Sequence, residues 1–410
     1  MRVSWRRAVS ALVGSACVGW IVGYAVGQQK LQAEAKGTVV AKKPMVRRKL
    51  DVDEEEELKD AASDTTDEGR IREAEEASVR WSNAQAQTAV WLDCDPGHDD
   101  CLAILLAVHS EELHLLGIST VQANQTLDRT TYNARSVLEA CGAADVPVVA
   151  GCARPFLRHS KICAEVHGET GLDGAELPAP RVPALKGNYA QVMYRAISAQ
   201  HRARGGREKV QLVCTAPMTN VAVLFMAYPD VVSMVEVVFM GGTMGVGNTG
   251  PVAEFNIQVD PEAAKLIMQA GCKVTMVPLE VTHTALVSPD IVRRIESPPS
   301  QLRAAMRDLM LFFRKSYEEM WGFESPPLHD PCAVAYVLRP DLFTTRSCAV
   351  EVETTNGWSL GQTIVDVHDQ FPDRPKNVNV AFSMDVSSFW DLMLAAMARA
   401  DTLSPMNRVA

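Results

Sequence analysis

Residues 93–100 read Asp-Cys-Asp-Pro-Gly-His-Asp-Asp, so four carboxylates fall within eight positions. The apolar run at 89–92 predicts a buried strand, and the apolar run at 101–108 predicts a buried helix. Acids at a turn between two buried elements repel one another and lose solvation. A hard cation such as Ca²⁺ or Mg²⁺, which prefers oxygen ligands, would stabilise them.

The alternative interpretation of this stretch is a helix N-cap with surface acids, because Asp caps helices and favours the positive end of the helix dipole. The Pro96-Gly97 pair between the acids argues against it, since this pair shapes a tight loop. We therefore expect a metal-binding loop that follows the first strand.

Composition and charge limit the class of protein. The chain has 410 residues, of which 47% are hydrophobic, enough for one large α/β domain or two smaller ones. The formal net charge is −10; residues 1–50 are strongly basic, residues 51–80 are strongly acidic, and the two segments cancel. The rest of the chain is therefore acidic, which does not suggest nucleic acid as a partner.

The ten cysteines are scattered without a CxxC pair, and we interpret most of them as buried, reduced thiols.

The first 87 residues do not resemble part of a globular fold. An uncharged stretch at 8–27 has about the length that spans a bilayer as a helix. A membrane anchor, a cleaved signal peptide and an organelle transit segment are three competing interpretations of residues 1–30, and we favour the anchor. Residues 31–87 are expected to form a charged, disordered linker. Basic residues after the apolar stretch outnumber those before it, which favours a catalytic domain on the cytoplasmic side, with secretory and organellar targeting as alternatives.

From residue 88 to residue 403, short apolar strands alternate with amphipathic helices. The predicted strands are Val90–Asp93, Leu113–Val121, Val146–Ala150, Val210–Thr215, Val235–Met240, Val274–Val281, Cys348–Thr354, Gln362–Val367 and Val378–Phe382. The predicted helices are Asp99–Ser110, Leu127–Cys141, Tyr189–Arg204, Thr219–Ala227, Pro261–Ala270 and Val386–Ala400. This alternation predicts one large α/β domain with an open, mainly parallel, Rossmann-like sheet flanked by helices. Ligands bind at the carboxyl ends of the strands in such sheets, where the acidic loop lies.

Other polar clusters also follow predicted strands. Asn124, the segment Thr215–Asn220 and a Gly-rich loop after Met240 lie at three strand ends, and His329-Asp330-Pro331 opens a helix. No GxxxxGK[ST] motif is present, nor a GxGxxG after a strand, so the sequence does not predict a phosphate-binding loop. Each cluster alone is a weak signal, but their shared placement predicts one site.

Three motifs in this order resemble the inosine–uridine-preferring nucleoside hydrolase family: Asp93–Asp100, Ala253-Glu-Phe-Asn256 with Asp260-Pro-Glu-Ala-Ala264, and His329-Asp330-Pro331. The similarity covers about residues 88–400. It implies Ca²⁺-dependent hydrolysis of the N-glycosidic bond of ribonucleosides, in which Asp99 activates a metal-bound water. We also expect a homo-oligomer, either a dimer or a tetramer.

The resemblance assigns roles to individual residues. Ca²⁺ would be bound by Asp95, Asp100, Asp330 and the backbone carbonyl of Thr215, while Asp93 would orient the loop. Asp99 would be the general base, and His329 the acid for the leaving base. The substrate would be held by Asn124, His167, Met240, Asn248, Glu254, Asn256 and Asp330.

The chemistry fits these residue types. Ribosyl transfer passes through an oxocarbenium-like state, as in glycoside hydrolysis, and water must be activated on one face of C1′. A metal ion lowers the pKa of water, and an adjacent carboxylate accepts the proton. Ca²⁺ also has coordination sites to spare for the vicinal hydroxyls of ribose.

Three positions depart from the family pattern. Ala123 and Ala216 stand where glycine is usual, and Ala would cost stability if either backbone needed a positive φ. Glu280 stands where a shorter Asp is common. None of these changes removes a predicted ligand or the base, so we expect an active enzyme. Tyr317 or Trp321 would cap the pocket, or else pack within a helix face.

Two other functions fit the sequence less well. A membrane-tethered nucleoside- or ribose-binding protein without turnover would need neither Asp99 nor His329. A haloacid-dehalogenase-type phosphotransferase also carries Asp-x-Asp after its first strand, but Pro96-Gly97 and the second Asp pair fit it poorly.

Overall fold

The computed structural model describes residues 87–408, which form one α/β domain. The predicted anchor or signal segment (1–30) and nearly all of the predicted linker (31–87) lie outside the described residues. Within residues 87–408, the helices are either too short or too polar to cross a lipid bilayer.

Eight strands form the central sheet, in the order β3-β2-β1-β4-β5-β6-β10-β7. All neighbouring pairs are parallel except β10 with β7, which is antiparallel. The strands are β1 (Thr88–Cys94), β2 (Leu113–Thr120), β3 (Val148–Ala150), β4 (Val210–Cys214), β5 (Val235–Met240), β6 (Val274–Val277), β7 (Phe343–Cys348) and β10 (Val378–Met384). A separate two-stranded sheet pairs β8 (Val350–Val352) with β9 (Thr363–Val365). The predicted open, mainly parallel sheet is confirmed.

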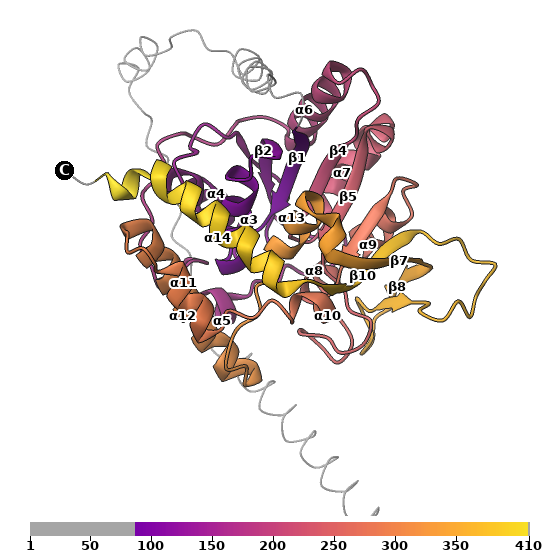
Figure 1. Cartoon of the computed structure of the whole chain (residues 1–410). Coiled ribbons are helices and arrows are strands. Elements are labelled where there is room, and N and C mark those ends of the chain that lie inside the picture. The colour runs from indigo at the N-terminus through magenta and orange to yellow at the C-terminus, as the bar shows by residue number, and fades with distance from the viewer. Residues whose placement is uncertain (1–86, 409–410) are drawn as a thin grey trace, which may run out of the picture. The chain divides into compact units, whose positions relative to one another are not determined.

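The helices cover both faces of the sheet (Figure 1). Those that contribute to the core on one face are α3 (His98–Val108), α4 (Leu127–Ala140), α10 (Leu279–Thr282), α11 (Pro289–Ile295), α12 (Gln301–Trp321), α13 (Pro331–Leu338) and α14 (Val386–Leu403). The core on the other face includes α6 (Tyr189–Ala203), α7 (Thr219–Ala227), α8 (Phe255–Val259) and α9 (Pro261–Met268). The remaining helical segments are α5 (Ala164–His167), η2 (Pro229–Met234), η3 (Pro340–Leu342) and η4 (Pro405–Asn407).

Alternating side chains of β1 show why the strand is apolar throughout. Val90, Leu92 and Cys94 pack into the core on the α3 side, whereas Ala89 and Trp91 pack into the core on the α6 side. Successive strand residues point to opposite faces, so a strand covered on both faces needs apolar residues at every position.

Two predicted strands need correction. The strand predicted at Val274–Val281 ends at Val277, because Pro278 interrupts it and Leu279 begins α10. The strand predicted at Cys348–Thr354 is in fact two elements: β7 ends at Cys348, and β8 begins at Val350 in the separate small sheet. Residues 343–347 of β7 escaped prediction because this edge strand is mostly polar and partly exposed.

Candidate functional site

The acidic loop lies at the point where the chain order of the sheet reverses. Strand β1 has β2 on one side and β4 on the other, and the loop after β1 opens at the carboxyl edge between them. This is the position at which open α/β sheets bind ligands. Gly97 is packed so closely that a Cβ there would lie 2.5 Å from Nδ1 of His167, so a larger residue would displace that ring.

Three carboxylates converge beside this loop. Oxygen atoms of Asp99, Asp100 and Asp330 all lie within 4.8 Å of one another, and all three side chains are buried. Asp99 and Asp100 come from the first turn of α3, and Asp330 is the N-cap residue of α13. The predicted pair of helix starts therefore meets at a single point.

The other two predicted metal ligands lie close to this group. The Oδ2 of Asp95 accepts a hydrogen bond from the backbone N–H of Asn124 at 2.7 Å. Its Oδ1 is buried and has no hydrogen-bond partner within residues 87–408. The hydroxyl of Thr215 donates to Oδ1 of Asp100 at 2.7 Å. An unpaired buried oxygen beside three crowded carboxylates fits a hard divalent cation, because such ions take oxygen ligands.

Burial and mutual repulsion perturb these acids. Burial, followed by repulsion from Asp100, raises the pKa of Asp99 to about 7. The same two causes raise the pKa values of Asp95 and Asp330 well above the ordinary value near 3.8. Groups with such shifts in a cavity are candidates for catalysis or metal binding.

A cavity of about 300 Å³ opens beside the acids. Of the twelve predicted site residues, all except the fully buried Asp95 and Asp100 line it: Asp99, Asn124, His167, Thr215, Met240, Asn248, Glu254, Asn256, His329 and Asp330. Residues that follow strands β1, β2, β4 and β5 thus line one cavity together with residues at the start of α13.

Backbone contacts determine which polar atoms face the cavity. The backbone N–H of Phe255 donates to Oδ1 of Asn248 at 3.0 Å, which leaves the Nδ2 of Asn248 as a donor. The Nδ2 of Asn256 donates to the carbonyls of Thr215 (3.0 Å) and Met240 (3.2 Å), which leaves its Oδ1 as an acceptor. This wall therefore offers both a donor and an acceptor to a polyol.

Part of the cavity lining is aromatic. Phe313, Tyr317 and Trp321 follow one another at four-residue spacing on α12, and the Tyr317 ring lies 4.7 Å from each of the other two centroids. A planar heterocycle would fit against such a surface. The prediction that Tyr317 or Trp321 contributes to the pocket agrees with this lining, and both also pack along the helix.

His329 lies between two hydroxyl groups. Its Nε2 is 2.8 Å from Oη of Tyr317, and its Nδ1 is 2.8 Å from Oγ1 of Thr282. Burial, with a smaller contribution from His283, lowers the pKa of His329 well below its ordinary value. Burial also raises the pKa of Tyr317 well above its ordinary value. These shifts favour the neutral form of both side chains, which share one hydrogen bond.

Several lining residues were not predicted from the sequence: Lys161, Cys163, Glu165, Val166, Thr249, Phe255, Phe313 and Met320. The i, i+4 spacing of Phe313, Tyr317 and Trp321 was the one pattern that could have marked Phe313. Met320 also lies on α12, next to Trp321, and the others lie on loops or short helices, where the sequence carries no periodic signal.

The two alanine departures cost no backbone strain. Among residues 87–408, Asp369 is the one non-glycine residue with a positive φ, so Ala123 and Ala216 adopt ordinary backbone conformations. Of the nine described cysteines none is paired, and six are buried, as expected of reduced thiols.

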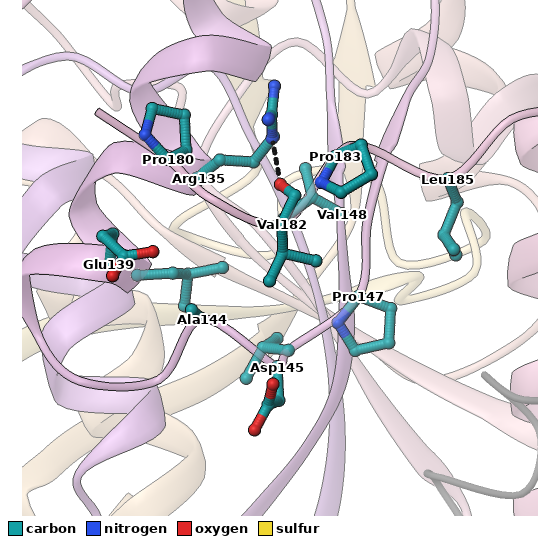
Figure 2. Close-up of a pocket in the computed structure, with 12 residues that line it drawn as sticks. Arg135, Glu139, Ala144, Asp145, Pro147, Val148, Pro180, Val182, Pro183 and Leu185 are labelled. Carbon is teal, nitrogen blue, oxygen red and sulfur yellow. Dashed lines mark hydrogen bonds between the residues drawn. The ribbon is translucent and has the colours of Figure 1, made fainter. Parts of the chain in front are cut away.

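A smaller hollow elsewhere, of about 170 Å³, is lined by parts of residues 135–148 and 180–185 (Figure 2). The Nε of Arg135 donates to the carbonyl of Val182 at 2.9 Å, and Glu139 is ion-paired with Arg181 at 2.6 Å. Most of the remaining lining is Val, Leu, Ala and Pro, so the hollow lacks the converging acids of the larger cavity.

Buried carboxylates, polar side chains and aromatic rings meet at one cavity, a combination that suits a hydrolase for sugar-linked heterocycles. Residues 90–391 match the model of the inosine-uridine preferring nucleoside hydrolase family, and the chain belongs to that family. It is therefore an N-glycosyl hydrolase that acts on nucleosides.

Similar proteins support this assignment. A probable ribonucleoside hydrolase of Dictyostelium discoideum is 44% identical over 319 residues, which cover 75% of this chain and 94% of that protein. A pyrimidine-specific ribonucleoside hydrolase of a Shewanella species is 40% identical over 309 residues, 75% of this chain and 95% of that protein. The solved structure of a purine-preferring ribonucleoside hydrolase from Gardnerella vaginalis superposes with a TM-score of 0.71 at 28% identity, covering 77% of this chain and 100% of that one.

Proposed function

We propose that this nucleoside hydrolase uses one Ca²⁺ ion, held by Asp95, Asp100, Asp330 and the backbone carbonyl of Thr215. The observation that carries the proposal is the group of buried carboxylate oxygens beside a cavity of about 300 Å³. When bound, the ion supplies positive charge that acidifies a water molecule and attracts the vicinal hydroxyls of ribose.

Asp99 acts as the general base. It lines the cavity and is only 5% exposed, so its carboxylate can reach a water molecule there that is shielded from bulk solvent. Asp99 accepts a proton from water as the water oxygen bonds to C1′. The C1′–N bond breaks, and its electron pair leaves with the base.

The polar wall binds the ribose. Donors and acceptors around the sugar come from Asn124, Asn248, Glu254 and Asn256. The same wall is completed by Asp330 and Met240. Three backbone N–H groups, of Gly242, Asn256 and Ile257, donate to the Glu254 carboxylate and hold it in place. A site of this kind discriminates against sugars that lack a hydroxyl, because its buried polar groups would be left unpaired.

The leaving base receives a proton beside the aromatic part of the lining. Tyr317 lines the cavity and hydrogen-bonds to His329, which in turn contacts Thr282. We infer that Tyr317 and His329 act as one proton-donating unit, and that His167 contacts the base or sugar from the adjacent wall.

If Tyr317 and His329 supply the proton, the loss of rate on replacing either residue should depend on the leaving group. His329→Ala and Tyr317→Phe should each slow the hydrolysis of natural nucleosides by roughly 10²-fold. Both should leave the hydrolysis of p-nitrophenyl riboside nearly unchanged, because nitrophenolate departs without a proton. Tyr317→Phe removes one oxygen and keeps the ring, so a loss in this variant is not explained by lost packing. Equal losses on both substrates would contradict the role of acid.

We further propose that pyrimidine ribonucleosides are the preferred substrates. The pyrimidine-specific relative is 40% identical, whereas the purine-preferring structure is 28% identical. Membrane attachment through residues 8–27, a cytoplasmic catalytic domain and a homo-oligomer remain predictions.

The test is a panel of uridine, cytidine, inosine, adenosine and 2′-deoxyuridine incubated with the full chain, with free sugar and free base both quantified. We expect ribose and base in equal amounts, fastest from uridine or cytidine and slowest from the deoxy analogue. Binding of nucleosides without release of either product would overturn the proposal.

A further inference from the structure

The loop after β5 carries Asn248 into the cavity, and a residue outside the cavity holds it there. Glu280, on α10, accepts a hydrogen bond at its Oε1 from the backbone N–H of Met244 at 2.8 Å. The Thr243 hydroxyl shares its hydrogen between this same oxygen (2.8 Å) and the backbone carbonyl of Val246 (2.9 Å). The Thr243 hydroxyl also accepts from the backbone N–H of Gly245 at 3.1 Å. One carboxylate oxygen thus organises the first half of the loop.

The small sheet holds the same loop from another side. The Oγ1 of Thr363, on β9, accepts from the backbone N–H of Thr243 at 2.9 Å and donates to its carbonyl at 2.6 Å. Gly242, with φ +74°, allows this approach, since a Cβ there would lie 2.9 Å from Oγ1 of Thr363. Thr243 is therefore anchored through both its backbone and its side chain.

Asn248 lies at the far end of this anchored loop. Its Oδ1 accepts from the backbone N–H of Phe255, and its own backbone N–H donates to the carbonyl of Ala253 at 3.2 Å. Residues 253–255 thus hold Asn248 from one side, and on the other side the chain enters it from residues 243–247. Val246, in the middle of that path, is 78% exposed, so packing does little to hold the segment.

Glu280 is an unfavourable choice if stability alone mattered. Its Oε2 is buried and has no hydrogen-bond partner within residues 87–408, which costs desolvation free energy. It does not line the cavity. Proteins retain such costs mainly where a geometry is needed for function.

We propose that Glu280 is a positioning residue for the substrate: it holds loop 243–247 so that Asn248 points at the ribose. This inference rests on the proposed function. Because Asn248 contacts ribose in both the ground state and the transition state, loss of its positioning should raise KM and leave kcat nearly unchanged.

The first experiment compares three variants of the full chain. Glu280→Met keeps the length of the side chain but removes both acceptors, and it should raise KM for uridine roughly fivefold to tenfold. Glu280→Gln retains an oxygen at the same place and should restore KM to within about twofold of wild type. Asp366→Leu is the matched control, since it also removes both acceptors: Asp366 holds a loop through two backbone N–H groups but does not line the cavity.

A double-mutant cycle separates positioning from general loosening of the fold. If Glu280 acts through Asn248, Glu280→Met should add little to the KM of Asn248→Ala. Thr243→Val, which removes the partner hydroxyl, should reproduce part of the effect and serves if Glu280→Met does not fold. An unchanged KM in Glu280→Met and in Thr243→Val would overturn the inference. Fully additive losses with Asn248→Ala, or an equally large KM increase in Asp366→Leu, would also overturn it. Failure of wild type to release ribose would instead refute the proposed function.

Discussion

Asp99→Asn should lower kcat by roughly 10²–10⁴-fold and leave Ca²⁺ binding intact. Asparagine keeps the shape and one oxygen of the side chain, but it does not accept a proton from water. The buried group consists of Asp99, Asp100 and Asp330. Asp99 lies in the first turn of α3 beside Asp100, but of these two neighbours only Asp99 lines the cavity. Single-turnover hydrolysis of uridine measures the loss.

The control for this prediction is the neighbouring acid. Asp100→Asn removes charge from a side chain that contacts Thr215, Gly97 and Asn124 but does not line the cavity, so it should weaken Ca²⁺ binding itself. Calorimetric titration with Ca²⁺ distinguishes the two variants. A rate close to wild type in Asp99→Asn would refute the assigned base.

Removal of the metal is expected to abolish activity and to destabilise the fold in a pH-dependent way. Burial raises the pKa values of Asp95, Asp99, Asp100 and Asp330. Chelation leaves these carboxylates close together without the opposing charge. Activity should return when Ca²⁺ is added in excess of the chelator.

The sign of the pH effect follows from the direction of these shifts. A carboxyl with a raised pKa binds more protons in the folded chain than in the unfolded chain, so the metal-free fold loses stability as pH rises. For Asp99 this window runs from about 3.8 to about 7. Protons also compete with Ca²⁺, so the gain in Tm from Ca²⁺ over chelator should be larger at pH 8 than at pH 5. Thermal unfolding at both pH values tests this, and an equal gain at each would contradict a site made of these acids.

The periodicity of apolar residues and the positions of Gly and Pro predicted most of the fold. Strands covered on both faces are apolar along their whole length, as β1 is, and such runs can be recognised without a structure. Strand β7 is a partly exposed edge strand with the sequence Phe-Thr-Thr-Arg-Ser-Cys, so neither hydrophobicity nor alternation marked it. Strands were also predicted where β8 and β9 form the small sheet, but the separation of this sheet from the main sheet depends on packing between distant segments.

The candidate site also has a part that the sequence predicts and a part that it does not. Residues at strand ends and helix starts, such as Asp99, Asn124 and Asp330, could be predicted to converge because parallel strands end at one edge. The hydrogen bond between Tyr317 and His329 could not, since it joins α12 to the loop before α13 through side chains alone. Glu280 was noticeable in the sequence only as a departure from the family pattern, and its contact with Thr243 appears only in the fold.

The most direct test of the proposed metal site is a calcium anomalous difference map from crystals grown with Ca²⁺. We predict one peak per chain, bounded by the carboxylates of Asp95, Asp100 and Asp330 and by the backbone carbonyl of Thr215. A map without a peak among these residues, in a chain that releases ribose from uridine, would contradict the assignment of the metal site.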